Sequence, residues 1–318
     1  MTLPTLSAPA SAAPAVPQPI VDIHCGWGAT ATAPNWNDIT AIGTAMKARG
    51  VGTAFVSSVL ARRYDLPAGN EALAGAISEA PKNGETDVRG WYVIHPARAS
   101  ECIAQMRRML YSPRFIGAAL YTDPQTCDPV SVTDAHDLVT AFRRYQKPLL
   151  VETPNIEAME EAIRIADDLQ GVPVIASGMG GDDWREAVVL AARPANLYLD
   201  ISGPLVPEKI EYALHMVHSR KMLFASGAPY TDPAAVVGLL DDVQMSARDR
   251  ARILYQNANR MFNLGGDTGI ERRPDTGSAP DGPANFLVGN VEGEGGETAS
   301  PALASLGFLG GQTEENPE

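Results

Sequence analysis

The stretch that decides the fold is Val172-Pro-Val-Ile-Ala-Ser177, followed by a helical segment over Trp184–Ala192 and then by Asn196-Leu-Tyr-Leu-Asp-Ile-Ser202. The two short segments are nearly continuous apolar runs, which is typical of strands that are buried on both faces. Strands of this kind that alternate with helices form right-handed βαβ units. The stretch therefore indicates an α/β protein with a parallel sheet.

The same alternation extends along most of the chain. Amphipathic helical stretches, such as the one that follows Asn155, separate eight short apolar segments. The predicted strands are Ile20–His24, Gly52–Ser58, Gly90–His95, Phe115–Tyr121, Pro148–Thr153, Val172–Ser177, Asn196–Ser202 and Lys221–Ser226. Eight such units predict a (β/α)₈ TIM barrel over residues 20–264. The alternative is an open doubly wound sheet, but the segment Cys25–Thr30 lacks the Gly-rich phosphate loop that such a sheet normally carries.

Two segments outside the barrel differ from it in composition. Residues 1–19 contain five prolines among small residues and predict a flexible lead-in. A final helix is predicted over Arg248–Leu264, ended by Gly265-Gly266. Residues 265–318 are rich in Gly, Pro, Glu and Ser and carry −8 of the net charge of −13, so we expect an acidic, disordered tail. Four apolar residues of this tail predict docking on an unidentified protein or peptide, or on a second copy of the chain: Leu303, Leu306, Phe308 and Leu309.

Charge and composition narrow the possible partners and the compartment. The acidic balance argues against nucleic acid and anionic membranes as partners. Apolar runs stay shorter than the roughly 18 residues of a membrane span, and the N-terminus does not resemble a secretory signal. Three widely spaced cysteines without a CxxC pair predict neither a disulfide framework nor a structural zinc site. We therefore expect a cytoplasmic protein.

A series of short phrases carries a family resemblance. It opens with Val21-Asp-Ile-His24 and continues in order along the chain. The further phrases are Asn70–Ala74, Phe115–Tyr121, Pro148–Thr153, Pro173–Gly181, Leu223–Tyr230 and Asn257–Phe262. Together they resemble the amidohydrolase-related family of metal-dependent hydrolases, a TIM-barrel family that includes decarboxylases and lactonases of aromatic and dicarboxylic acids. Seven phrases in the family's order form a fairly specific signal.

The resemblance implies a divalent metal that activates a water molecule, held by imidazoles and a carboxylate. His24 matches the first histidine of the family motif, whereas the second histidine falls on Gly26. The fifth-strand histidine falls on Glu152, the sixth-strand histidine on Gly178 and the eighth-strand aspartate on Gly227. Glycine has no ligand atom, and a catalytic zinc site normally has three protein ligands. We therefore expect neither a metal nor another cofactor.

His24 and Glu152 are the candidate catalytic residues, because both stand at the C-terminal ends of predicted barrel strands. An acid at the end of a buried strand needs a partner, and an arginine, a hydroxyl group or a ligand would satisfy Glu152. Further polar residues at strand ends either bind a ligand or cap the following segment. These candidate ligand-binding residues are Asp22, His95, Tyr121, Asp200 and Ser202.

Two functions fit these observations. In the first, the chain is a catalytically degenerate pseudoenzyme that serves as a binding or docking scaffold, for instance in a bacterial biosynthetic pathway. In the second, it is a metal-independent hydrolase or decarboxylase that acts on a small carboxylic acid, ester or amide through His24 and Glu152. The lost metal ligands favour the scaffold, because function is argued from the site rather than from the fold.

Overall fold

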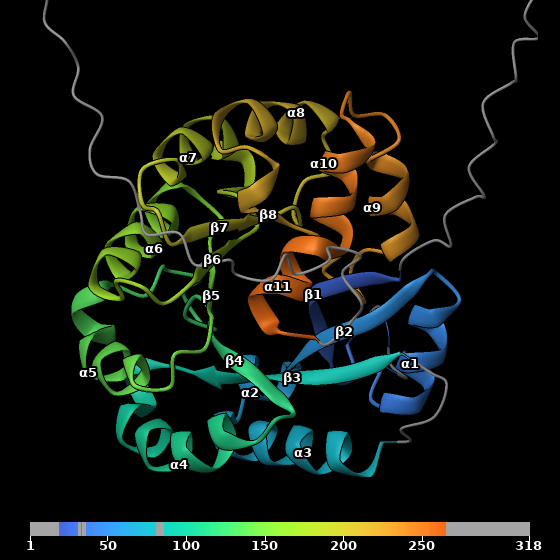
Figure 1. Cartoon of the computed structure of the whole chain (residues 1–318). Coiled ribbons are helices and arrows are strands. Elements are labelled where there is room, and N and C mark those ends of the chain that lie inside the picture. The colour runs from blue at the N-terminus through green and yellow to red at the C-terminus, as the bar shows by residue number, and fades with distance from the viewer. Residues whose placement is uncertain (1–18, 31–32, 34–35, 81–85, 265–318) are drawn as a thin grey trace, which may run out of the picture. The chain divides into compact units, whose positions relative to one another are not determined.

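Eight parallel strands, hydrogen-bonded in sequential order, form the centre of the protein (Figure 1). The computed structural model describes residues 19–30, 33, 36–80 and 86–264. The strands are β1 Ile20–Trp27, β2 Val51–Ser58, β3 Asp87–Ile94, β4 Phe115–Leu120, β5 Leu149–Glu152, β6 Val174–Ser177, β7 Leu197–Asp200 and β8 Met222–Leu223. Each predicted strand is therefore present, although several are shorter than the sequence indicated.

The sheet closes on itself between β1 and the segment that follows β8. The backbone N–H of Ile23 donates to the carbonyl oxygen of Phe224 at 3.0 Å, and Gly227 N–H donates to His24 at 2.9 Å. Because the chain after β8 continues this pairing with β1, no open edge remains at the site where the first and last strands meet. The predicted α/β TIM barrel is confirmed.

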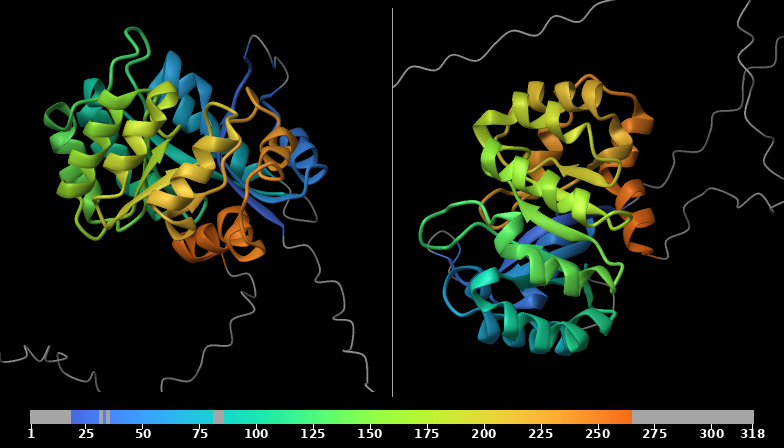
Figure 2. Two further views of the ribbon diagram at one scale, coloured as in Figure 1. Left: turned by 90° about the horizontal axis from the view of Figure 1, so that it is seen from above. Right: turned by 90° about the vertical axis from the view of Figure 1, so that its left-hand side faces the viewer.

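Helices surround the strands, as Figures 1 and 2 show. They are α1 Ile39–Lys47, α2 Val59–Arg63, α3 Leu66–Glu79, α4 Ala99–Tyr111, α5 Val132–Arg143, α6 Ile156–Asp168, α7 Trp184–Ala191, α8 Pro207–Met216, α9 Pro233–Leu239, α10 Ala247–Ala251 and α11 Asn257–Phe262. In α6 the Asn155 side chain accepts from the N–H of Ala158, which satisfies one free donor of the first turn. The same helix buries Met159, Ile163 and Ala166, as its sequence periodicity predicted.

Aromatic side chains fill part of the barrel interior. Trp91 is fully buried, and its indole N–H donates to the Ile23 carbonyl oxygen at 2.7 Å. Phe262 packs edge-on against Phe55, with ring centroids 4.7 Å apart, and against Trp91 at 5.8 Å. Gly117 is needed beside this cluster, because a Cβ atom there would lie 2.1 Å from the Pro148 carbonyl oxygen. The last helix of the barrel therefore takes part in its core.

The last helical region differs from the single helix predicted over Arg248–Leu264. It consists of α10, a π-helical turn over Arg252–Gln256 and α11. Asn263, which has a φ of 48°, ends it, so the predicted role of Gly265-Gly266 as the terminator is wrong. Asparagine adopts this left-handed conformation more readily than most residues, which explains the earlier end.

The two predicted flanking segments, 1–19 and 265–318, lie outside the described residues apart from Pro19. Within residues 19–30, 33, 36–80 and 86–264, no helix is long and apolar enough to cross a membrane. All of these described residues belong to one compact unit.

Candidate active site

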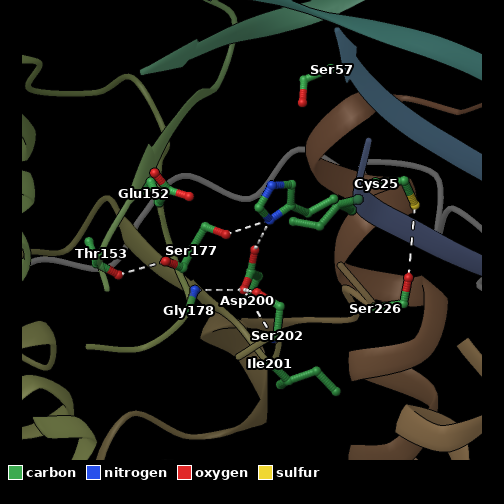
Figure 3. Close-up of polar contacts among 12 residues, drawn as sticks. Cys25, Ser57, Glu152, Thr153, Ser177, Gly178, Asp200, Ile201, Ser202 and Ser226 are labelled. Carbon is green, nitrogen blue, oxygen red and sulfur yellow. Dashed lines mark hydrogen bonds and ion pairs between the residues drawn. The ribbon is translucent and has the colours of Figure 1, made fainter. Parts of the chain in front are cut away.

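His24 is the centre of the polar cluster at the C-terminal ends of the strands. It stands near the end of β1 and is buried, with 11% of its side chain exposed. Its Nδ1 atom lies 2.6 Å from Ser177 Oγ and 3.4 Å from a carboxylate oxygen of Asp200, while its Nε2 atom lies 3.3 Å from the Tyr121 hydroxyl. Figure 3 shows Ser177 and Asp200 side by side at the ends of their strands. Three strands thus fix the imidazole.

Asp200 is held rigidly beside His24. Its Oδ1 atom accepts from the Gly178 N–H at 3.0 Å, the Ser202 N–H at 3.1 Å and the Ser202 hydroxyl at 2.6 Å. Burial alone would raise the pKa of Asp200. The hydrogen bond and the charge of His24, together with hydrogen bonds from Ser177 and Ser202, hold this pKa below its ordinary value. Asp200 is therefore an anion, and it favours a proton on the facing Nδ1 atom of His24.

Tyr121 covers the other nitrogen of His24. Its hydroxyl donates to Ser57 Oγ at 2.7 Å, a shorter contact than the 3.3 Å to Nε2. Burial raises the pKa of Tyr121 to about 12, although the neighbouring Arg62 charge opposes the rise. The tyrosine proton is directed to Ser57, so when the imidazole proton is on Nδ1 the lone pair of Nε2 is available to accept a proton.

Glu152 lines the site, but its oxygens are already occupied. Oε1 accepts from Arg62 at 2.8 Å, and Oε2 accepts from both the backbone N–H and the hydroxyl of Thr122, at 3.1 and 2.8 Å. Arginine and a hydroxyl group thus satisfy this acid, as expected from its position at the end of β5. The Arg62 guanidinium also stacks on the Tyr121 ring at 3.7 Å. Both carboxylate oxygens of Glu152 therefore already have hydrogen-bond partners.

A cavity of about 430 Å³, which we call the central cavity, opens above His24. Its polar and charged lining includes His24, Arg62, Glu152, Ser177, Ser202 and Ser226. Cys25 also lines it, but burial and the charge of Asp22 raise the pKa of this thiol well above its ordinary value, so it is a poor nucleophile. The mouth of the barrel is therefore an open pocket of the size that small ligands occupy, with several polar side chains in a largely apolar lining.

The remaining predicted ligand-binding residues lie elsewhere. Asp22 is fully buried beneath the site, where its Oδ1 accepts from Ser226 N–H at 3.0 Å and His24 N–H at 3.3 Å. Burial raises the pKa of Asp22 despite these hydrogen bonds. His95 does not line the central cavity; its Nδ1 accepts from the Ala97 N–H at 3.2 Å, so it caps the short helix Pro96–Arg98. The contact of His95 corresponds to the capping alternative that the sequence left open.

Sequence reasoning missed Ser177 and Arg62. Ser177 ends a buried apolar strand, which is a detectable signal, since polar residues at that position of a barrel strand face the mouth. Arg62 lies on the short helix α2, and its partner Glu152 is 90 residues away in sequence, so no local pattern reveals the contact.

The donor set does not suit the metal that the family resemblance implies. Within the described part of the chain, no group of three or more His, Cys, Asp or Glu side chains could hold a metal ion. Glu152 is bound to Arg62 and Thr122, and the Gly178 N–H points to Asp200. Gly26 and Gly227 contribute no side-chain donor. His24 and Asp200 alone are fewer than the three protein ligands of a catalytic zinc site, so the residues present do not fit this metal.

The fold and the site define a (β/α)₈ barrel with a histidine–aspartate pair beneath an open cavity at the carboxyl ends of its strands. The family model described as Amidohydrolase matches residues 21–264, and the chain belongs to that family.

Solved structures with the same fold include two decarboxylases. The 2,6-dihydroxybenzoate decarboxylase from Rhizobium has a TM-score of 0.62 at 15% identity, with 78% of this chain and 100% of that chain covered. The 5-carboxyvanillate decarboxylase from Sphingomonas paucimobilis has a TM-score of 0.58 at 12% identity, covering 78% and 99%. An uncharacterised TIM-barrel protein from Bordetella bronchiseptica has a TM-score of 0.60 at 18% identity, covering 77% and 98%. No curated protein matches the chain. Identities this low establish the fold alone.

Proposed function

We propose that this barrel is a metal-independent acid–base enzyme that acts on a small carboxylic acid, ester or amide bound in the central cavity. The observation that carries the proposal is the His24–Asp200 pair, with Nδ1 3.4 Å from the carboxylate, at the floor of an open cavity. A barrel that had become only a docking scaffold would have no need to keep the histidine oriented by three strands.

His24 is the proton-transfer group in this proposal. Asp200 and Ser177 hold its Nδ1 side, so the opposite nitrogen accepts a proton from the ligand or returns one to it. Asp200 stabilises the imidazolium that forms during transfer, in the same way that a buried acid orients other catalytic histidines. Glu152 and Arg62 are positioning residues at the wall of the cavity.

The substrate class rests on the cavity and on the relatives. A cavity of about 430 Å³ accommodates a molecule of the size of a substituted benzoate. The decarboxylases with this fold act on 2,6-dihydroxybenzoate and 5-carboxyvanillate, which are small carboxylic acids. The structural likeness supports this class of substrate but does not identify the particular compound.

A second candidate is the non-catalytic binding scaffold. The observation in its favour is that the implied ligand positions 26, 178 and 227 are glycines, which contribute no proton-transfer side chain to the central cavity. The scaffold would bind a small molecule in the cavity without converting it.

The deciding experiment is a screen of hydroxybenzoates and their esters and amides with the full chain in the presence of a chelator. We expect turnover that falls at least about 100-fold in His24→Ala and in Asp200→Asn, the usual loss when an acid–base group is removed. His136→Ala, which changes an exposed histidine on α5, is the matched control and should retain full activity. Compounds that bind in the cavity by calorimetry but are never converted would favour the scaffold, and turnover independent of His24 would contradict the mechanism.

A further inference from the structure

A second cavity of about 280 Å³, which we call the flank cavity, lies beside the central cavity at the ends of β2, β3 and β4. Arg62 and Arg63 line both cavities. The charged and polar lining of the flank cavity includes Arg62, Arg63, His95, Arg98, Tyr121 and Asp123. None of the proton-transfer groups proposed above, His24 and Asp200, belongs to this lining.

His95 presents a buried donor in this cavity. Its Nδ1 accepts a hydrogen bond from Ala97 N–H at 3.2 Å, so the proton of the neutral ring is on Nε2. Burial lowers the pKa of His95, which favours this neutral form, although the charge of Asp123 opposes the shift. The Nε2 atom is buried and has no hydrogen-bond partner. A buried donor left unpaired is destabilising, and an acceptor that enters the cavity would offset this cost.

Two arginines add further unmatched donors. The Nε atom of Arg62 is buried without a hydrogen-bond partner, while its Nη2 atom is bound to Glu152. Arg63 is exposed, and no ion pair or hydrogen bond of its guanidinium is found within the described residues. The unsatisfied groups around the cavity are thus donors, and two of the three side chains carry a positive charge.

Asp123, the acidic residue in the lining, is not a hydrogen-bond partner of these donors in the structure. Asp123 is partly exposed, and its Oδ1 atom accepts from the N–H groups of Gln125 and Thr126 in its own loop, at 2.8 and 3.0 Å. Solvent partly screens its charge. Arg98 is paired with Glu101 at 2.8 Å and is more than half exposed, so it is not counted among the available donors.

We propose that the flank cavity binds an oxyanion, the carboxylate or phosphate group of a small molecule, through Nε2–H of His95 and the guanidinium groups of Arg62 and Arg63. Planar guanidinium groups and a fixed N–H donor suit oxyanions, because hydrogen bonds to a charged acceptor are stronger than neutral ones. The site goes beyond the acid–base function and does not depend on proton transfer at His24.

Calorimetry of the full chain with inorganic phosphate and, separately, with acetate tests the proposal. We expect saturable binding of at least one anion, and the tighter of the two identifies the group. His95→Phe and Arg63→Gln should each weaken it by about tenfold or more, the usual effect of losing one charge-assisted hydrogen bond. His136→Phe and Arg107→Gln, two exposed matched controls on α5 and α4, should bind as the wild type does.

Further measurements distinguish loss of anion binding from a folding defect and from a failure of the proposed enzymatic function. In the wild type, the ¹⁵N resonance of His95 Nε2 should shift on titration with the same anion, and His95→Gln, which supplies an N–H donor, should recover part of the affinity. His24→Ala should leave anion binding unchanged, so a failure of the acid–base mechanism does not affect this result. Absence of saturable binding, an unmoved His95 resonance, binding insensitive to His95→Phe, or loss of binding in His24→Ala would each overturn the proposal.

Discussion

His24 and Ser177 are 153 residues apart in sequence and 2.6 Å apart in the structure. Only one of these two residues, His24, could be predicted from the sequence as part of the site. His24, Glu152 and Ser202 were identified because each ends a buried strand, and they do line one cavity. Their roles depend on partners from other strands, such as Arg62 for Glu152, and single-sequence patterns carry no information about such pairings. The charge state of the site therefore required the structure.

Two of the glycines that replace the implied ligands have backbone conformations that favour glycine. Gly178 has a φ of +95° and Gly227 a φ of +74°, a region that side chains disfavour. We predict that Gly178→His lowers the free energy of unfolding by about 1–2 kcal/mol without creating a metal site. Chemical denaturation and titration with zinc would check both parts, with the exposed glycine position Gly75→Ala as the control for a tolerated change. A stable variant that binds one zinc ion would show that the backbone still accepts a ligand there.

Lys209 is a buried cation close to the site. Its ammonium group donates to the carbonyl oxygens of Ile201 and Ser202, at 3.4 and 2.7 Å. Burial lowers the pKa of Lys209 from 10.5 to about 8, and the charge of Asp200 limits the decrease.

The pH dependence of stability follows from this shift. The folded protein releases the Lys209 proton near pH 8, whereas the unfolded chain retains it to about pH 10.5, so between these values this group makes stability rise with pH. We predict that the stability of the wild type relative to Lys209→Met increases over this window by up to about 3 kcal/mol. Denaturant unfolding of both proteins from pH 7 to 10.5 measures it. A difference that stays constant with pH would mean that Lys209 titrates normally.

At the scale of elements, two phrases of the family resemblance have structural roles. Asn70 in α3 donates to the Val93 carbonyl oxygen at 2.8 Å and accepts from its N–H at 3.1 Å, which ties the helix to β3. Asn257 in α11 donates to the carbonyl oxygens of Ser219 and Met222. These phrases predicted the fold correctly because they serve the fold, whereas phrases that would hold a metal have lost their ligands. The break in the last helix was not predictable, because a π-helical turn has no clear sequence signature.

Substitution of Asn70 tests whether this phrase of the family resemblance has a structural role. We predict that Asn70→Ala lowers the free energy of unfolding by about 2–4 kcal/mol, because two buried backbone groups of Val93 lose their partner. Ser78→Ala on the exposed side of the same helix should change it by less than about 0.5 kcal/mol. Equal effects of the two substitutions in denaturant unfolding would argue against a structural role for Asn70.

At the scale of the whole molecule, the barrel was predictable because eight buried strands leave eight similar apolar runs. The predicted docking role of the acidic tail is not tested by the structure. Its four apolar residues lie outside the described residues: Leu303, Leu306, Phe308 and Leu309. Docking of this apolar group, on another protein or on a second copy of the chain, stays a prediction.

Removing the tail tests that prediction. We expect deletion of residues 280–318 to leave the unfolding midpoint of the barrel unchanged within about 1 °C, because the core lies within residues 20–264. Partner capture from the native host, or self-association measured by sedimentation, should be lost in the deletion and also when the four apolar residues are replaced by serine. Retention of every interaction in both variants would remove the docking role.

We propose that His24 and Asp200 form a proton-transfer site that needs no metal. The metal content of the full chain, purified from medium supplemented with zinc and manganese, tests this proposal. We expect well under one tightly bound divalent ion per chain, because His24 and Asp200 provide too few ligands. About one zinc or manganese ion per chain, lost on His24→Ala, would contradict it.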